Sequence, residues 1–147
     1  MIREATDIAS TAERLRPVVL RLARELRRET EQLGVTSRQV TLLWLVREHP
    51  GLTLRELAAL EGISAPSLSA HVDRLERAGL IARVRRGDDR RRVGLALTPA
   101  GSQLLRRVRT RRTTWLAKRL SGLEPGEVEA IERALAPLRK LLPQEDA

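Results

Sequence analysis

Charged residues that suit an anionic partner are concentrated in one ten-residue stretch, residues 83–92. It contains Arg83, Arg85, Arg86, Asp88, Asp89, Arg90, Arg91 and Arg92, a net charge of 6 − 2 = +4. Like charges this close repel one another and do not help a chain to fold, so an anionic partner is the simplest reason for their presence. An arginine here is long enough to enter the minor groove of duplex DNA, where a narrow groove has a more negative potential. Asp89 is placed to hold the guanidinium of Arg91 through a paired, fork-shaped contact.

Small and hydroxyl-bearing side chains are concentrated just before this stretch, in residues 64–78. With Leu68, Val72 and Leu75 assigned to the core, the side chains left to face outward are Ser64, Ala65, Pro66, Ser67, Ser69, Ala70, His71, Asp73, Arg74 and Arg77. Such a face can approach the major groove closely, and its hydroxyls and free N–H groups can meet base edges or phosphates. The predicted DNA contacts are Ser64, Pro66, Ser67, Ser69, Ala70, His71, Arg74, Arg83, Arg85, Arg86, Asp89, Arg90 and Arg91.

Catalytic and metal-binding patterns are weak by comparison. Ser67 and His71 lie four residues apart on one helix face, but Asp73 lies two residues past His71 and faces elsewhere. No glycine-rich oxyanion or phosphate loop is present in the sequence. His49 and His71 are the only histidines, and they fall in separate elements, which matches no metal site. We therefore expect neither an enzyme nor a cofactor or metal.

Composition restricts the compartment and the number of domains. The chain has 147 residues, 41% hydrophobic and 32% charged, with Lys+Arg 28 against Asp+Glu 19 and a net charge of +9. This length suits a single domain over residues 1–147. The absence of cysteine excludes disulfides and thiol switches and indicates a reducing cytoplasm. No stretch is apolar enough to span a membrane, and residues 1–7 lack the apolar core of a signal peptide.

Aromatic residues are nearly absent, since the chain has no Phe or Tyr and only two Trp, Trp44 and Trp115. Proteins that bind single-stranded nucleic acid usually stack bases on exposed aromatic side chains. Duplex DNA, contacted through phosphates and groove edges, instead suits a basic protein without aromatics. Two interpretations of Trp44 and Trp115 stay open, a place in the core, which we favour, and the lining of a ligand pocket.

The elements that must position these residues begin with four helices. Apolar residues at helical spacing predict an amphipathic helix over residues 8–32, with a kink or a late start at Pro17. Capping-box patterns predict a second helix over residues 36–49 and a short third helix over residues 53–62. A fourth helix, residues 64–78, follows a tight glycine turn, so the third and fourth form a helix-turn-helix.

After Gly79 the apolar period changes toward two, which is typical of strands. Residues 80–86 and 92–97 are predicted to form a β-hairpin, with residues 87–90 as the turn. In the second strand we expect Val93, Leu95 and Leu97 to face inward and Gly94 and Ala96 to face outward.

Two C-terminal helices are predicted, over residues 98–120 and about 125–142, the second with a bend at Pro137. The first carries a basic run with no acidic residue near it: Arg106, Arg107, Arg109, Arg111, Arg112, Lys118 and Arg119. This run can pair with glutamates of the last helix or with the N-terminal helix of another subunit, or it can face DNA or solvent.

The order of these elements and several specific residues resemble the MarR family of bacterial transcriptional regulators, which are winged helix-turn-helix homodimers. The matching residues are Ile63, Leu68, Ser69, Val72, Arg74, Leu75, Gly79, Leu80, Ile81 and Arg83, then Asp89, Arg90 and Arg91, then Leu97, Thr98, Pro99, Ala100 and Gly101. In the family an Asp-x-Arg element places an arginine in the minor groove, and Asp89 and Arg91 match it here.

The resemblance implies a mainly α fold with a small β-hairpin wing, a DNA-binding lobe over residues 36–98, and dimerisation helices over residues 1–34 and 99–147. The hypothesis that follows is a dimeric, sequence-specific regulator that reads the major groove with helix 64–78 and the minor groove with the wing 83–92, on a pseudo-palindromic operator. The family also implies a repressor that releases DNA on sensing a small molecule, bound between the dimer helices and the DNA-binding lobe. The alternative is a nonspecific architectural DNA-binding protein, which would bind all sequences alike.

Overall fold

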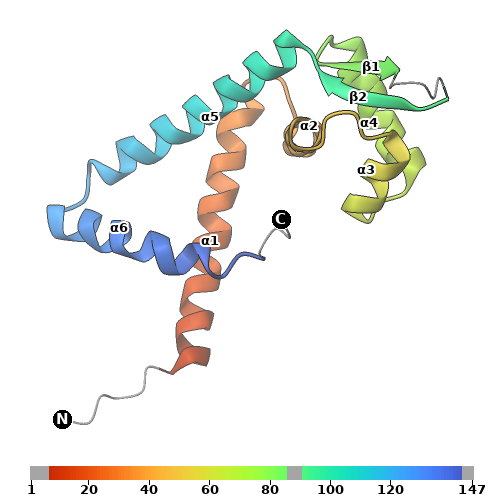
Figure 1. Ribbon diagram of the computed structural model, residues 1–147. Coiled ribbons are helices and arrows are strands. Elements are labelled where there is room, and N and C mark those ends of the chain that lie inside the picture. The colour runs from red at the N-terminus through yellow and green to blue at the C-terminus, as the bar shows by residue number, and fades with distance from the viewer. Residues whose placement is uncertain (1–6, 86–90, 144–147) are drawn as a thin grey trace. The chain divides into compact units, whose positions relative to one another are not determined.

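The computed structural model describes residues 7–85 and 91–143, and these residues are mainly helical with one β-hairpin (Figure 1). The elements are α1 (Ile8–Glu31), α2 (Ser37–Glu48), α3 (Leu54–Glu61), α4 (Ala65–Arg77), β1 (Ile81–Arg85), β2 (Val93–Leu97), α5 (Pro99–Leu120) and α6 (Pro125–Arg139). The described residues fall into two compact units, one ending at Arg112 and one beginning at Thr113. The predicted fold class, mainly α with a small hairpin, is confirmed.

Short polar side chains begin the helices of the helix-turn-helix where the sequence predicts. Thr36 and Thr53 both form complete capping boxes, in which the hydroxyl accepts from the backbone N–H three residues on and Gln39 or Glu56 accepts from the threonine N–H. α3 ends at Gly62, whose φ of 64° lies in the left-handed region that favours glycine. A tight turn therefore separates α3 from α4.

The core of the first unit lies beneath the helix-turn-helix and the hairpin. α4 contributes Leu68, Val72 and Leu75, which are 3%, 0% and 1% exposed. They belong to one buried cluster with Leu43 and Val46 of α2, Leu57 of α3, Ile81 and Leu95 of the hairpin, and Leu105 and Val108 of α5. Because these three side chains of α4 share one face of the helix, the opposite face is turned outward.

Backbone hydrogen bonds join the hairpin to the loop before α3. β1 and β2 are antiparallel, with Val84 opposite Gly94. On the other edge of β2, the N–H of Gly51 donates to the carbonyl of Leu95 and the N–H of Leu95 donates to the carbonyl of Leu52, both at 2.9 Å. The hairpin is thus anchored to the helix-turn-helix by main chain as well as by side chains.

The predicted alternation of β2 is wrong at Gly94, which is buried rather than outward. The reason is the close approach of Gly51, since a Cβ on Gly94 would lie only 2.4 Å from the Gly51 carbonyl oxygen. Only glycine allows two backbones to lie this close. Periodicity along one strand does not show which distant segment covers its other face.

The ends of several elements differ from the sequence expectations. α1 begins at Ile8, as the predicted range has it and without the late start allowed at Pro17, because the Asp7 carboxylate accepts from the N–H of Ala9 at 3.1 Å and caps the helix there. β1 begins at Ile81 rather than Leu80, and β2 begins at Val93 rather than Arg92. Residue 86 and the expected turn, residues 87–90, lie outside the described residues.

The last helix, α6, is also shorter than predicted and ends at Arg139. Leu141 and Leu142 follow it and are 69% and 65% exposed. Within the described residues, little packs against these leucines to hold a further turn, and an unpacked helix end is marginally stable in water.

We predict that Gly94→Ala lowers the free energy of unfolding by about 1 to 3 kcal/mol, the usual cost of overpacking a filled site. The added methyl group would meet the backbone of Gly51, which is held by its hydrogen bond to Leu95. Urea unfolding followed by circular dichroism measures the change. Gly126→Ala is the matched control, because an added Cβ there meets no atom within 4 Å. Equal destabilisation by both substitutions would contradict the prediction.

Candidate nucleic-acid interface

The outward face of α4 is a continuous stripe of small and basic residues. Pro66, Ser67 and Ala70 are exposed in its N-terminal half, and Arg74 and Arg77 are exposed in its C-terminal half. These positions lie opposite the buried leucines and valine, as helical geometry requires. The predicted pattern, small residues flanked by arginines, is present on one surface.

Serines build the N-terminus of this helix. The Ser64 Oγ accepts from the N–H of Ser67 at 3.4 Å, and the Ser64 hydroxyl donates to the Ser67 Oγ at 3.0 Å. The first turn of α4 contains no acidic residue, so the positive end of the helix dipole is unopposed there. Its free N–H groups suit an anion such as a phosphate. Ser69, a further predicted contact, is half-buried beside the exposed stripe.

His71 differs from the outward orientation that the sequence suggests. Its side chain is half-buried, and its Nδ1 is buried with no hydrogen-bond partner in the part of the chain that the structure describes. The ring lines a small cavity of about 80 Å³ with Arg38 and Leu42 of α2 and with Ile63. Position 71 lies next to the buried stripe of α4, so packing turns it toward α2. Ser67 is hydrogen-bonded to Ser64 and not to His71.

Two arginines of the wing hairpin, formed by β1, β2 and the residues that connect them, are paired with acids of the helix-turn-helix. The Arg83 Nε lies 2.9 Å from the Glu76 Oε2, and its Nη2 lies 2.9 Å from the Asp73 Oδ1, both on α4. Arg92, on the other side of the hairpin, pairs with Glu56 of α3. The charge count of residues 83–92 therefore overstates the positive charge that this hairpin offers to a partner.

Of the other predicted DNA contacts in the wing, the structure describes Arg85 and Arg91. Arg85 is exposed and makes no ion pair with any described residue, and Arg91 is exposed. Arg85 lies two residues from Arg83, so both project from the same face of β1. Arg86, Asp89 and Arg90 lie outside the described residues.

The arginines of the basic run of α5 are divided between several contacts. The Arg111 Nη2 donates to the Gln32 side chain, and its Nε lies 3.5 Å from the Glu29 Oε2 of α1. The Arg112 Nε donates to the Leu26 carbonyl at 3.3 Å, and burial lowers the pKa of this guanidinium. Two arginines of the run thus connect α5 to α1 of the same chain, a partner that the sequence alternatives did not include.

Both tryptophans also make cation–π contacts with arginines. Trp44 is half-buried against the core, with the guanidinium carbons of Arg47 and Arg109 at 5.0 Å and 5.7 Å from its ring centroid. Such cation–π contacts are favourable at these distances. Trp44 thus packs against the core cluster, as we favoured, whereas Trp115 is half-buried in the second unit and is not part of the described core cluster. In the second unit, Arg119 lies 4.2 Å from the ring centroid of Trp115.

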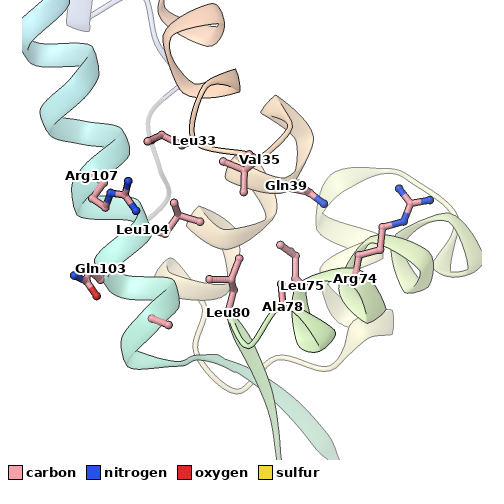
Figure 2. A pocket seen from close by; sticks show the side chains of 12 residues that line it. Leu33, Val35, Gln39, Arg74, Leu75, Ala78, Leu80, Gln103, Leu104 and Arg107 are labelled. Carbon is pink, nitrogen blue, oxygen red and sulfur yellow. The ribbon is translucent and has the colours of Figure 1, made fainter.

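A groove of about 400 Å³ lies beside α4 within the first unit (Figure 2). Its lining is mostly apolar and includes Leu33, Val35, Leu75, Leu80 and Leu104. Arg74 and Arg107 lie at opposite sides of it, and none of the lining residues is acidic (Figure 2). The groove therefore combines an apolar floor with positive charge.

Over residues 7–85 and 91–143, no helix is long and apolar enough to cross a membrane. Over the same residues, no cluster of three or more His, Asp or Glu is arranged to hold a metal ion.

A helix-turn-helix with an arginine-bearing two-stranded wing defines the class of winged helix-turn-helix proteins. Known proteins with similar sequences identify the family. The sequence profile of the MarR family matches residues 35–93. The transcriptional repressor MdtR of Bacillus subtilis is 32% identical over 104 residues, which cover 71% of this chain and 67% of MdtR. The chain belongs to the MarR family.

Solved structures show the same fold. The transcriptional regulator Tm0710 from Thermotoga maritima has a TM-score of 0.77 at 25% identity, covering 90% of this chain and 94% of its own. A variant of MepR from S. aureus, bound to an oligodeoxyribonucleotide, has a TM-score of 0.70 at 24% identity, covering 90% of this chain and 98% of its own. The resemblance and the winged-helix fold predicted from the sequence are confirmed, and they place the chain among DNA-binding regulators of transcription.

We predict that Ser64→Ala lowers the free energy of unfolding by about 1 kcal/mol, because the N–H of Ser67 loses its acceptor at the start of α4. Thermal and urea unfolding measure the loss. Ser64→Asp restores a capping oxygen at the same position and should recover most of the stability. If the aspartate variant is as unstable as the alanine variant, the cap is not the cause.

Proposed function

We propose that this chain is a homodimeric, sequence-specific regulator that binds duplex DNA with α4 in the major groove and the wing in the minor groove. The observation that carries the proposal is the exposed stripe of α4, with small residues at its N-terminal half, next to a wing with exposed arginines. Ser67 and Ala70 leave room for base edges, and Arg74 and Arg77 flank them. A protein that coats DNA without reading it needs only phosphate contacts and has no use for this small-residue face.

Arg91 is the proposed minor-groove reader. It is exposed and lies in the wing just before Arg92 and β2. With Asp89 it matches the Asp-x-Arg element of the MarR family. A guanidinium in a narrow minor groove is favoured by the negative potential there.

Exposed apolar residues on the terminal helices support a homodimer. Val18, Val19 and Leu22 are exposed on α1, and Ile131 and Leu135 are exposed on α6. Amphipathic helices with an exposed apolar stripe gain stability by packing on another helix. We propose residues 1–34 and 99–147 as the dimer interface and residues 36–98 as the DNA-binding lobe. Two-fold symmetry would then match a pseudo-palindromic operator, with half-sites about 34 to 36 Å apart.

The groove beside α4 supports a response to a small molecule. Its apolar floor and two arginines suit a ligand with an apolar body and an anionic group. Arg74 lines this groove and also lies on the exposed face of α4, so a bound anion would compete with DNA for its guanidinium. This supports a repressor that releases its operator when the ligand binds. We place the protein in the cytoplasm, as the absence of cysteine suggests.

Selection of bound sequences from random duplex DNA by the purified protein tests the proposal. A regulator should enrich one sequence with two-fold symmetry and bind it at least about a thousandfold more tightly than random DNA at fixed salt. Repeating the selection with aromatic and aliphatic carboxylates tests the ligand response. Equal affinity for all sequences would favour the architectural alternative.

We predict that Arg91→Ala weakens binding to the selected operator by about 1 to 3 kcal/mol, the usual contribution of one specific arginine contact. Gel-shift titration measures the change. Arg28→Ala is the control, because Arg28 is paired with Glu25 of its own helix α1, outside the proposed DNA-binding lobe. Unchanged operator affinity in Arg91→Ala would remove the wing from the mechanism.

A second substitution tests the dimer. Leu22→Glu puts a charge on the exposed apolar stripe of α1, where burial in an interface would leave it unpaired. We expect a shift toward monomer in analytical ultracentrifugation, together with weaker operator binding. Leu60→Glu is the control for the oligomeric state, because Leu60 is also exposed, at 56% against 44% for Leu22, but lies on α3, outside the proposed dimer interface. A Leu22→Glu protein that stays dimeric would place the interface elsewhere.

A further inference from the structure

Arg83 makes two separate hydrogen-bonded ion pairs with the recognition helix. Its Nε contacts the Glu76 Oε2 and its Nη2 contacts the Asp73 Oδ1, each at 2.9 Å. Asp73 and Glu76 lie three residues apart, so their carboxylates stand side by side on α4. A guanidinium held on two edges is fixed in direction as well as position, which a lysine ammonium cannot reproduce.

The local charge also argues against a phosphate contact at this position. One arginine and two carboxylates have a net charge of 1 − 2 = −1, so the cluster does not attract a phosphate. Arg85 offers the comparison, since it projects from the same face of β1 and makes no ion pair with any described residue. The two arginines are alike in the sequence but differ in their surroundings.

We propose that Arg83 is a positioning residue, which holds the wing at a fixed place relative to α4 and does not bind DNA itself. Arg92 and Glu56 tie the other strand to α3, so both strands of the wing are held by the helix-turn-helix. Arg83 thereby sets the spacing between the helix in the major groove and the wing arginine in the minor groove. The inference rests on the proposed function, in which α4 and the wing read one duplex together.

The test is binding of the full chain to its selected operator and to random duplex DNA over a range of salt concentrations. A residue that neutralises a phosphate contributes about one unit to the slope of log affinity against log salt, and a positioning residue contributes none. Arg83→Ala should weaken operator binding about 2- to 25-fold, since exposed ion pairs contribute up to about fivefold each. Its salt slope and its affinity for random DNA should stay unchanged. Arg83→Lys should show the same loss, whereas Arg85→Ala should weaken binding to both DNAs and lower the slope.

A variant that keeps Arg83 and removes its acidic partners changes DNA affinity in opposite directions for the two roles. In Asp73→Asn with Glu76→Gln, a positioning role predicts weaker operator binding, because the wing is released from α4. A phosphate-binding role predicts tighter binding to both DNAs, because the guanidinium is freed from its carboxylates. If Arg83→Ala does not fold, as thermal unfolding would show, this double variant decides.

A fall of about one unit in the salt slope of Arg83→Ala, or tighter binding by the double variant, would overturn this inference alone. A wild-type protein that prefers no sequence would overturn the proposed function, and the inference with it. The two failures are therefore distinguishable.

Discussion

The burial of one stripe of α4 is the constraint on which the DNA-facing surface depends. Leu68, Val72 and Leu75 are held in the core by hydrophobic packing with the neighbouring helices and the hairpin. Their burial turns Ser67 and Arg74 to the opposite side. The side chains proposed to contact DNA are therefore oriented by the packing of the opposite face of α4, in which they do not take part.

Electrostatics separates the arginines into two groups. Those near packed helices meet carboxylates, carbonyls or a tryptophan ring, as Arg83, Arg109 and Arg112 do. Arg85, at the end of β1, instead makes no ion pair with any described residue. Counting positive charges along the chain does not make this distinction, so the count could not show that Arg83 and Arg92 are paired with acids of the helix-turn-helix.

Local signals in the sequence were sufficient for most element boundaries. These signals are local: the capping boxes at Thr36 and Thr53, the Ser64 cap and the left-handed Gly62. Each acts between residues three or four positions apart, so both partners can be recognised in the sequence. The family resemblance added the identification of the predicted hairpin as a wing and of Asp89 and Arg91 as an Asp-x-Arg element. The orientation of His71 was missed, because it lies at the edge of the buried stripe and its direction depends on how α2 packs there.

The sequence by itself determined the helix-turn-helix, the hairpin and the basic character of the surface, because each follows from periodicity, capping or charge within a short stretch. Only the tertiary structure decided that Gly94 is buried against Gly51, that Arg83 is held by Asp73 and Glu76, and that Arg111 reaches α1. These contacts join residues between 7 and 82 positions apart, and no local pattern specifies which distant segments will meet.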